Sequence, residues 1–279
     1  MYKTKIIVFE GGDCCGKTSL LEATYDELMK QGLKVVKFKF PVYDGVFGKE
    51  ILDHLKNWDI SAHSEKENLD ELEKISKHLY INKLTAFTDF LNLAKDKDFV
   101  LVDRFVLSQY IYDKSWSGVF EKTLDNKVVL DRALNIARAY FTAFPEVYTF
   151  VVLPNDYVKI ISRASSDRRV DQYDKLDKYQ SEVSANFKCI SSLDSKFIGF
   201  ELLGKKSFVI NSDENLKALI KFDPSLNTEE YVKSLTLTDD ITKNIELYKT
   251  NSDKWIDLFK KYTKQTVEFI IEGVNDYDK

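Results

Sequence analysis

Short runs of apolar residues alternate along this chain with longer stretches in which apolar residues recur every three or four positions. The short runs are typical of strands, and the longer stretches are typical of amphipathic helices. The five candidate strands span residues 6–9, 35–40, 99–102, 147–153 and 207–210. This alternation predicts an α/β fold, in which crossover helices join five parallel strands into one sheet that is covered by helices on both faces.

Two of the candidate strands differ in how evenly they are apolar. Residues 99–102 are apolar throughout, as expected of a strand at the centre of a parallel sheet. In residues 35–40, by contrast, Lys37 and Lys39 alternate with apolar side chains. The second strand is therefore expected to have one face that is less covered.

The longest helical pattern runs from about residue 67 to residue 94. The apolar stripe of this predicted helix consists of Leu72, Ile75, Leu79, Ala86 and Phe90. Asn82 and Lys83 interrupt the stripe where a further apolar residue is expected. Two interpretations of Lys83 stay open: its ammonium group reaches the surface along an apolar stem, or it points into a substrate cleft.

The alternation of strands and helices ends near residue 223, and the remainder of the chain has a helical pattern. We therefore predict a domain of residues 1–222 that holds the sheet, and a helical C-terminal extension of residues 223–279 packed on it. No Gly- or Pro-rich linker separates the two parts.

One helix of the extension carries a wide apolar face. Its start is signalled by Asn251, Ser252 and Asp253. The face consists of Trp255, Leu258, Phe259 and Tyr262. It either docks on the core of the chain or forms a subunit interface, and the pattern alone does not choose between the two.

The composition narrows the class of protein. Of the 279 residues, 44% are hydrophobic and 31% are charged, which is ordinary for a folded soluble protein. No apolar stretch approaches the length of a membrane span or resembles the apolar core of a signal peptide, so we expect a cytoplasmic protein without a membrane partner. A net charge of −4 disfavours a broad nucleic-acid surface, which needs many clustered lysines and arginines.

Cysteines and histidines are few. The three cysteines are Cys14, Cys15 and Cys189, and their spacing does not match a zinc site. The three histidines form no metal-ligand cluster in the sequence either. Cys14 and Cys15 are adjacent, and the sequence leaves open whether they are reactive thiols near a helix N-terminus or small side chains that fit a tight loop.

A glycine-rich segment follows the first candidate strand and leads into a helix. Its residues are Gly11, Gly12, Asp13, Cys14, Cys15, Gly16, Lys17, Thr18 and Ser19. The spacing is that of a phosphate-binding loop, or P-loop, in which backbone N–H groups and the positive end of the next helix bind phosphate. Lys17 is then expected to reach the β- and γ-phosphates, and the Thr18 hydroxyl to ligate Mg²⁺. We predict that this whole segment binds ATP.

A second group of polar residues lies at the end of the third strand. Asp103 and Arg104 come at this end, and Ser108 and Tyr112 follow them. Open parallel sheets bind ligands at the carboxyl ends of their strands, so we expect these residues beside the P-loop. An aspartate there can hold Mg²⁺ or its water ligands, and an arginine can bind a second phosphate through its planar guanidinium group.

On these segments the chain resembles the thymidylate kinase family of nucleoside monophosphate kinases. The similarity covers residues 4–220 and is most specific in the run from Phe9 to Thr18 and in Asp103-Arg104-Phe105 with Ser108. The looser matches are Phe40-Pro41, Gly48, and Asp171-Gln172-Tyr173-Asp174 with Tyr179 and Phe187.

The resemblance implies a P-loop kinase-type three-layer sandwich. It also implies a reaction that moves the γ-phosphate of ATP, with Mg²⁺, onto dTMP to give dTDP. Asp13 would contact the sugar 3′-hydroxyl of the monophosphate, while Thr18 and Asp103 would hold the metal. The monophosphate-binding residues so predicted are Asp13, Phe40, Lys83, Arg104, Ser108, Tyr112 and Tyr173. The partners are then ATP and a deoxynucleoside monophosphate, and the expected assembly is a homodimer.

The chain also departs from the family pattern. Some members carry a catalytic arginine in the P-loop where this chain has Cys14, so we expect that cation to come from the mobile lid. The predicted catalytic residues are Lys17, Asp103, Arg104 and the lid arginines Arg163, Arg168 and Arg169. The alternative to a catalytic role is a structural one, in which these arginines stabilise a helix C-terminus and keep a loop in solvent.

Two further departures touch the acceptor side, and alternatives to a dTMP kinase stay open. Tyr43 and Lys83 stand where the family usually has arginines, which allows dUMP or a 5-modified dUMP as the acceptor.

A deoxynucleoside kinase is a second alternative. Such an enzyme needs a base beside its hydroxyl acceptor and characteristically has Glu-Arg-Ser where this chain has Asp103-Arg104-Phe105. A nucleotide-binding or assembly protein without activity is the third alternative. The C-terminal extension supports it, and the presence of Lys17, Thr18, Asp103 and Arg104 argues against it.

Overall fold

In a computed structural model of the protein, the described residues are 2–13, 15–116, 119–120, 125–153, 176–191, 202–204, 206–222, 228–238 and 240–275. Five strands form a parallel sheet in the order β2-β3-β1-β4-β5. The strands are β1 (Lys5–Gly11), β2 (Val35–Lys39), β3 (Phe99–Asp103), β4 (Val147–Val152) and β5 (Lys206–Ile210). The predicted α/β class and the five parallel strands are confirmed.

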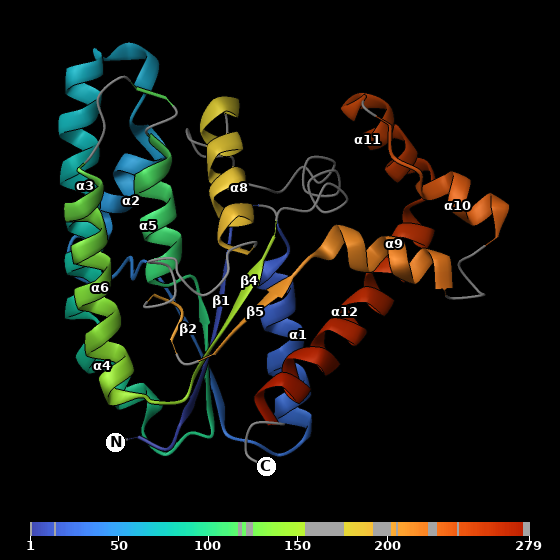
Figure 1. Ribbon diagram of the computed structural model, residues 1–279, viewed down its shortest axis with the longest axis horizontal. Helices are drawn as coiled ribbons and strands as arrows, with labels where there is room; N and C mark the ends of the chain where they lie inside the picture. Colours follow the sequence, from blue (N-terminus) through green and yellow to red (C-terminus); the bar gives the residue numbers. More distant parts are fainter. Residues whose placement is uncertain are drawn as a thin grey trace.

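Helices cover both faces of this sheet, so the fold has three layers (Figure 1). One face carries α3 (Glu65–Thr85), α4 (Phe87–Ala94), α5 (Val106–Ser115), α6 (Asn126–Ala143) and α8 (Asp177–Ser191). Against α3 lies α2 (Gly48–Asn57), and the short 3₁₀ helix η1 (Ile60–Ala62) precedes α3. The opposite face carries α1 (Lys17–Lys30), α9 (Ser212–Phe222) and α12 (Ser252–Asn275).

The described hydrophobic core has two parts, one on each face of the sheet, and the sequence pattern of β1 explains this division. Because successive side chains of a strand point to opposite faces, Ile6 and Val8 enter the core under α3, α4, α5 and α6. Ile7 and Phe9 enter the second core, under α1, α9 and α12. All five residues of β3 are buried, whereas β2 is an edge strand in which Lys37 and Lys39 are exposed. The expectation for β2 is confirmed, and β3 is an interior strand between β2 and β1, while β1 is the strand at the centre of the sheet.

The long helix predicted over residues 67–94 is divided, and that prediction is corrected here. The helix α3 ends at Thr85 and α4 begins at Phe87. The Lys83 carbonyl, which an uninterrupted helix would pair with the amide of residue 87, accepts a hydrogen bond of 2.8 Å from Tyr140 Oη on α6. Tertiary packing against α6 thus competes with the helical hydrogen bond, and a sequence pattern does not reveal such a competitor.

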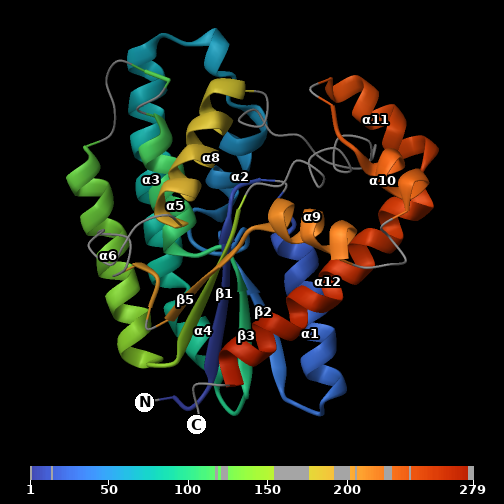
Figure 2. The ribbon, with the colours of Figure 1, turned by 45° about the vertical axis from the view of Figure 1, so that its right-hand side comes forward.

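The helical C-terminal extension is present, and its largest helix packs on the sheet domain. After α9 the described chain forms α10 (Glu229–Leu235), α11 (Ile241–Thr250) and α12. Trp255, Leu258 and Tyr262 of α12 are buried in the core beneath α1, and α12 lies beside α1 in both ribbon views (Figures 1 and 2). The apolar face of this helix therefore docks on its own chain. The domain boundary at residue 222 and the homodimer stay predictions.

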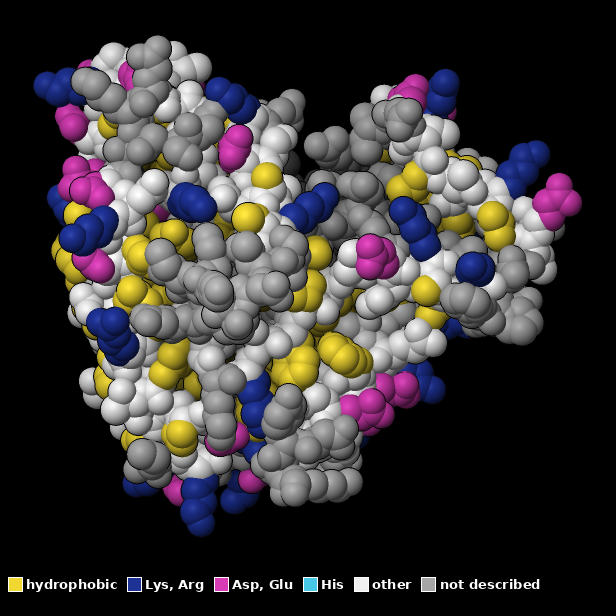
Figure 3. Space-filling view, viewed as in Figure 1, with side chains coloured by type: hydrophobic (Ala, Val, Ile, Leu, Met, Phe, Trp, Pro, Cys, Tyr) yellow, Lys and Arg dark blue, Asp and Glu magenta, His cyan; other side chains and the backbone are white. Residues whose placement is uncertain are grey.

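The described surface has mixed charge. Figure 3 shows lysine and arginine side chains interspersed with aspartate and glutamate over the face that it presents. In the described part of the chain, no helix is both long and apolar enough to cross a membrane. The cytoplasmic location and the lack of a nucleic-acid partner stay predictions from the sequence.

Candidate active site

The predicted phosphate loop joins β1 to α1, and its shape depends on two glycines. Gly11 has a φ of +150°, and a Cβ atom on it would lie 2.3 Å from the carbonyl oxygen of Val152 on β4. Gly16 has a φ of 88° and directly precedes Lys17, the first residue of α1. Any larger residue would be strained at both positions. The loop therefore turns tightly enough to aim the N-terminus of α1 at the carboxyl edge of the sheet, as a phosphate site requires.

Lys17 lies folded against this loop. Its Nζ atom donates to the Gly12 carbonyl oxygen at 2.6 Å and lies 3.7 Å from Cys15 Sγ. The residue is only 6% exposed, although its side chain carries a charge. An ammonium group has three donors, so Lys17 can also bind phosphate oxygens brought to the loop. Thr18 and Ser19, the next two residues predicted to bind ATP, are exposed on the first turn of α1.

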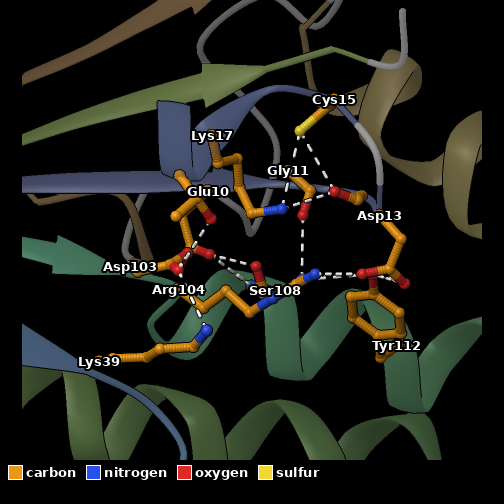
Figure 4. A network of polar contacts seen from close by, with 12 residues as sticks. Glu10, Gly11, Asp13, Cys15, Lys17, Lys39, Asp103, Arg104, Ser108 and Tyr112 are labelled. Carbon is orange, nitrogen blue, oxygen red and sulfur yellow. Dashed lines mark hydrogen bonds and ion pairs between the residues drawn. The ribbon is translucent and has the colours of Figure 1, made fainter. Parts of the chain in front are cut away.

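Arg104 connects the end of β3 to the phosphate loop, as Figure 4 shows. Its guanidinium group forms a salt bridge with Asp13 and donates to the Gly11 carbonyl oxygen at 3.1 Å. It also donates to Tyr112 Oη at 3.2 Å, and Tyr112 Oη donates to Asp13 Oδ2 at 2.7 Å. Four predicted site residues therefore form one network across the edge between β1 and β3. The network holds the guanidinium group beside the loop.

Glu10 positions the helix that carries Ser108 and Tyr112, and the sequence analysis did not single it out. The backbone N–H groups of Phe105, Leu107 and Ser108 donate to its carboxylate at 3.1, 3.0 and 3.1 Å. The Ser108 hydroxyl donates to it as well. Glu10 is 1% exposed, and burial raises its pKa, against the opposing effect of these hydrogen bonds and of Arg104. Its carboxylate thus satisfies the N-terminus of α5, where orphan N–H groups need an acceptor.

Asp103 has the environment expected of a magnesium ligand. Thr18 Oγ1 donates to Asp103 Oδ2 at 3.2 Å, and Lys39 Nζ lies 3.5 Å from the same oxygen. The other oxygen, Oδ1, is buried and has no hydrogen-bond partner in the described structure. Mg²⁺ is usually held by one or two carboxylates together with substrate phosphates, so a single aspartate beside a threonine fits. These residues can hold the metal that the sequence predicted.

Lys83 is buried deep beside the predicted acceptor residues. It is 2% exposed, so its ammonium group does not reach the surface. The other interpretation, that it points into a substrate cleft, stays a prediction. Its Nζ atom lies 5.6 Å from the centre of the Phe40 ring and donates to Gln109 Oε1 at 3.3 Å. Gln109 Nε2 donates in turn to Asp113 Oδ1 at 3.0 Å. Lys83, Gln109 and Asp113 therefore form a hydrogen-bonded series of buried side chains that begins beside the Phe40 ring.

Burial shifts the pKa of Lys83 and of Asp113, the two ionisable residues of this series. It lowers the pKa of Lys83 to about 8, with the carboxylates of Glu10 and Asp113 acting in the opposite direction. It raises the pKa of Asp113 to about 6, against hydrogen bonds from Ser76 and Gln109. Desolvation disfavours the charged form of each group, and the two shifts have opposite sign because one group is a base and the other an acid.

The remaining predicted site residues are placed as follows. Phe40 is buried among aromatic rings at the end of β2, and the Ser108 hydroxyl is engaged by Glu10. Five residues lie outside the described part of the chain: Cys14, Arg163, Arg168, Arg169 and Tyr173. The roles proposed for all of these residues stay predictions. Glu10, Lys39, Gln109 and Asp113 are neighbours of the site that the sequence analysis missed.

The fold and the geometry of this site define a class. A parallel α/β sheet with a glycine-rich loop and a lysine after β1, and an Asp-Arg pair after the neighbouring β3, has the architecture of the P-loop kinases.

Comparison with known proteins finds similarity to one family within this class. Residues 9–137 match the family model described as "Thymidylate kinase". Two curated proteins named "Probable thymidylate kinase", from Methanococcus maripaludis strains C6 and C7, are each 27% identical over 237 residues, which is 80% of this chain and 98% of theirs. A solved thymidylate kinase from Candida albicans is 14% identical, with a TM-score of 0.47 over 90% of this chain and 93% of its own. The family model and the curated relatives support the thymidylate kinase family, so the resemblance seen in the sequence is confirmed.

Proposed function

We propose that this protein is a thymidylate kinase that transfers the γ-phosphate of ATP to dTMP and releases ADP and dTDP. The observation that carries the proposal is the network in which Arg104 reaches Asp13 and the Gly11 carbonyl of the phosphate loop. It supports the proposal because a cation that would bind a second phosphate lies beside the loop that would bind the first. A protein that only binds one nucleotide has no need of that second cation.

Transfer between two phosphates brings two anions together through a loose transition state, which needs in-line placement and neutralisation of charge. The acceptor is already an anionic nucleophile, so no strong general base is required. On the donor side, Lys17 and the N–H groups at the start of α1 would bind the β- and γ-phosphates of ATP. The lid arginines Arg163, Arg168 and Arg169 remain the predicted source of the further cation.

On the acceptor side, Arg104 would bind the phosphate of the monophosphate through its planar fork. Asp13 would contact the sugar, and Phe40 and Tyr112 would pack against the base and ribose. The network around Arg104 fixes its rotamer before any ligand arrives, which lowers the entropy cost of binding. When bound at Thr18 and Asp103, Mg²⁺ would neutralise part of the phosphate charge.

The proposal is tested by measuring ADP release in a coupled assay with ATP and Mg²⁺. The acceptors to compare are dTMP, dUMP, 5-hydroxymethyl-dUMP, dCMP, dGMP and thymidine. We expect the highest kcat/KM with dTMP. Turnover of thymidine without turnover of any monophosphate would identify a deoxynucleoside kinase instead, and ATP binding without turnover of any acceptor would identify a nucleotide-binding protein.

A second candidate is a kinase for dUMP or a 5-modified dUMP, and the position of Lys83 favours it. A buried ammonium group beside Phe40 replaces the arginine that the family usually presents from this helix. The 5-methyl group of thymine is worth only about 1 to 3 kcal/mol of discrimination in an apolar pocket. A modest change around the base could therefore shift the preferred pyrimidine, and the same assay decides between the two candidates.

The pKa of Lys83 predicts how acceptor use depends on pH. If the charged ammonium group helps to bind the acceptor, kcat/KM for the monophosphate should fall about tenfold per pH unit above pH 8, because kcat/KM follows ionisations of the free enzyme. The sign follows from the lysine, which loses its charge as the pH rises through about 8. Acceptor titrations at saturating ATP between pH 6.5 and about 9.5 measure this limb of the profile.

The matched control is Lys83→Met, which removes the charge and retains an unbranched side chain. Its kcat/KM for the acceptor should be low at every pH and flat across the range in which the native enzyme declines. A decline with the same apparent pKa in Lys83→Met would assign the limb to another group.

A further inference from the structure

A lysine that the sequence analysis did not assign to the site lies at the predicted metal carboxylate. Lys39 is the last residue of β2 and pairs in register with Asp103, the last residue of β3. Its Nζ atom is 3.5 Å from Asp103 Oδ2, and Figure 4 shows the side chain running from the edge strand toward that carboxylate. The lysine side chain is 61% exposed and the aspartate side chain 7% exposed.

The strand pattern explains why a cation reaches this position. Lys37 and Lys39 alternate with Phe38 on edge strand β2, so both point to the same face of the sheet. Lys37 pairs there with Glu22 on α1, at 2.5 Å. Lys39 is two residues closer to the carboxyl edge of the sheet and meets Asp103 instead. The same geometry thus gives one lysine a surface partner and the other a partner in the candidate active site.

The side chain of Asp103 is buried, so its negative charge must be compensated by groups close to it. Thr18 and Lys39 both approach Oδ2, while Oδ1 is buried and unpartnered in the described structure. Burial of a carboxylate is costly unless a counter-charge or a metal compensates it. Among the described ion pairs, Lys39 supplies the counter-charge of this carboxylate.

We propose that Lys39 is a counter-ion for Asp103 that a divalent metal displaces, so that Lys39 and the metal compete for one carboxylate. The proposal rests on the metal-binding role of Asp103 in the proposed function. Competition follows from charge, since an ammonium group and a divalent cation within a few ångströms of each other repel. Displacement is feasible because most of the lysine side chain is in solvent and it can rotate away without movement of the backbone.

Displacement would couple the metal to the second substrate. The freed ammonium group remains at the carboxyl end of β2, one residue before Phe40, and adds positive charge beside the acceptor side. The metal would therefore neutralise the donor phosphates and also release a mobile cation from Asp103.

Direct measurement of metal affinity tests the competition. Mn²⁺ binding is followed by electron paramagnetic resonance without nucleotide, in the native protein and in Lys39→Met. We expect Lys39→Met to bind Mn²⁺ about three- to tenfold more tightly, because a like charge near the ion is removed but was partly screened by solvent. Mg²⁺ should also raise the Tm of Lys39→Met more than that of the native protein, since the metal replaces the lost counter-ion.

Matched variants separate this role from others. Lys37→Met removes a lysine from the same strand and face but not from Asp103, and its Mn²⁺ affinity should equal that of the native protein. Lys39→Arg keeps the charge and should stay within about twofold of it. In an Asp103→Asn background, Lys39→Met should have no further effect on Mn²⁺ affinity, because the shared ligand is gone.

Unchanged or weaker Mn²⁺ affinity in Lys39→Met overturns the proposal, as does the absence of measurable Mn²⁺ binding by both proteins. These outcomes leave the proposed function intact, because the acceptor assay tests phosphate transfer independently. Conversely, a protein without kinase activity could still show the competition for metal.

Discussion

Replacement of Arg104 by alanine is expected to lower kcat/KM for the monophosphate by on the order of 10³, a loss comparable to that of other arginines that bind a reacting phosphate. The reason is geometric. The guanidinium group is held by Asp13, the Gly11 carbonyl and Tyr112, so its remaining N–H groups have a fixed direction. Steady-state kinetics with dTMP at saturating ATP measures the loss.

The affinity for ATP separates an acceptor role from a structural one. Calorimetric titration of Arg104→Ala with ATP should give a Kd within about fivefold of the native value, because Lys17 and the N-terminus of α1 are unchanged. Equal losses for ATP and for the monophosphate would show instead that Arg104 acts by holding the phosphate loop through Asp13.

Two further variants refine this result. Arg104→Lys keeps the charge but lacks the planar fork, so its activity should lie between those of the native enzyme and Arg104→Ala. Arg138→Ala removes an exposed arginine of α6 and should leave both substrates unaffected.

Much of this site was predictable because its chemistry is local in sequence. The phosphate loop is a continuous segment, and its two positive-φ glycines are Gly11 and Gly16, both present in the sequence motif. Asp103 and Arg104 were located by the rule that ligands bind at the carboxyl ends of parallel strands. The structure then places Arg104 on that loop, because β1 and β3 are neighbours and Phe9 pairs with Asp103.

What the sequence analysis missed depends on contacts between residues distant in the chain. Glu10 stands among apolar residues of β1, and its acceptor role follows only from α5, which begins 96 residues later at Val106. In the sequence, Lys39 is one of two lysines that alternate with apolar residues along an edge strand. Its proximity to Asp103 is known only once the register of β2 and β3 is fixed. An ionisable side chain inside or at the end of an apolar strand is the signal that could have identified both.

The break between α3 and α4 has the same origin. The apolar stripe continues through both helices, so periodicity predicts one helix. Tyr140, on a different helix, donates a hydrogen bond to the Lys83 carbonyl oxygen, and local helix propensity carries no information about that contact. The position of Lys83 was left open for the same reason, since a lysine on an apolar stripe can reach the surface along its stem or point into a cleft, and the stripe alone does not distinguish the two.

Replacement of Glu10 by glutamine is expected to lower the free energy of unfolding by about 3 kcal/mol, a large loss for a change that conserves shape. Oε1 accepts from the N–H groups of Phe105 and Leu107, and Oε2 accepts from the N–H group and the hydroxyl of Ser108. Either orientation of a glutamine amide would turn its NH₂ group toward two donors. Urea denaturation followed by circular dichroism measures the change.

Glu22→Gln is the matched control for this substitution. Glu22 is exposed on α1 and pairs with Lys37, so the same chemical change should cost less than about 0.5 kcal/mol there. Glu10→Gln should also raise KM for the monophosphate more than it lowers kcat for transfer, because the N-terminus of α5 places Tyr112 and borders Arg104. Stability equal to that of Glu22→Gln would mean that the N-terminus of α5 finds other acceptors, and that Glu10 does not hold the helix on which the acceptor side is built.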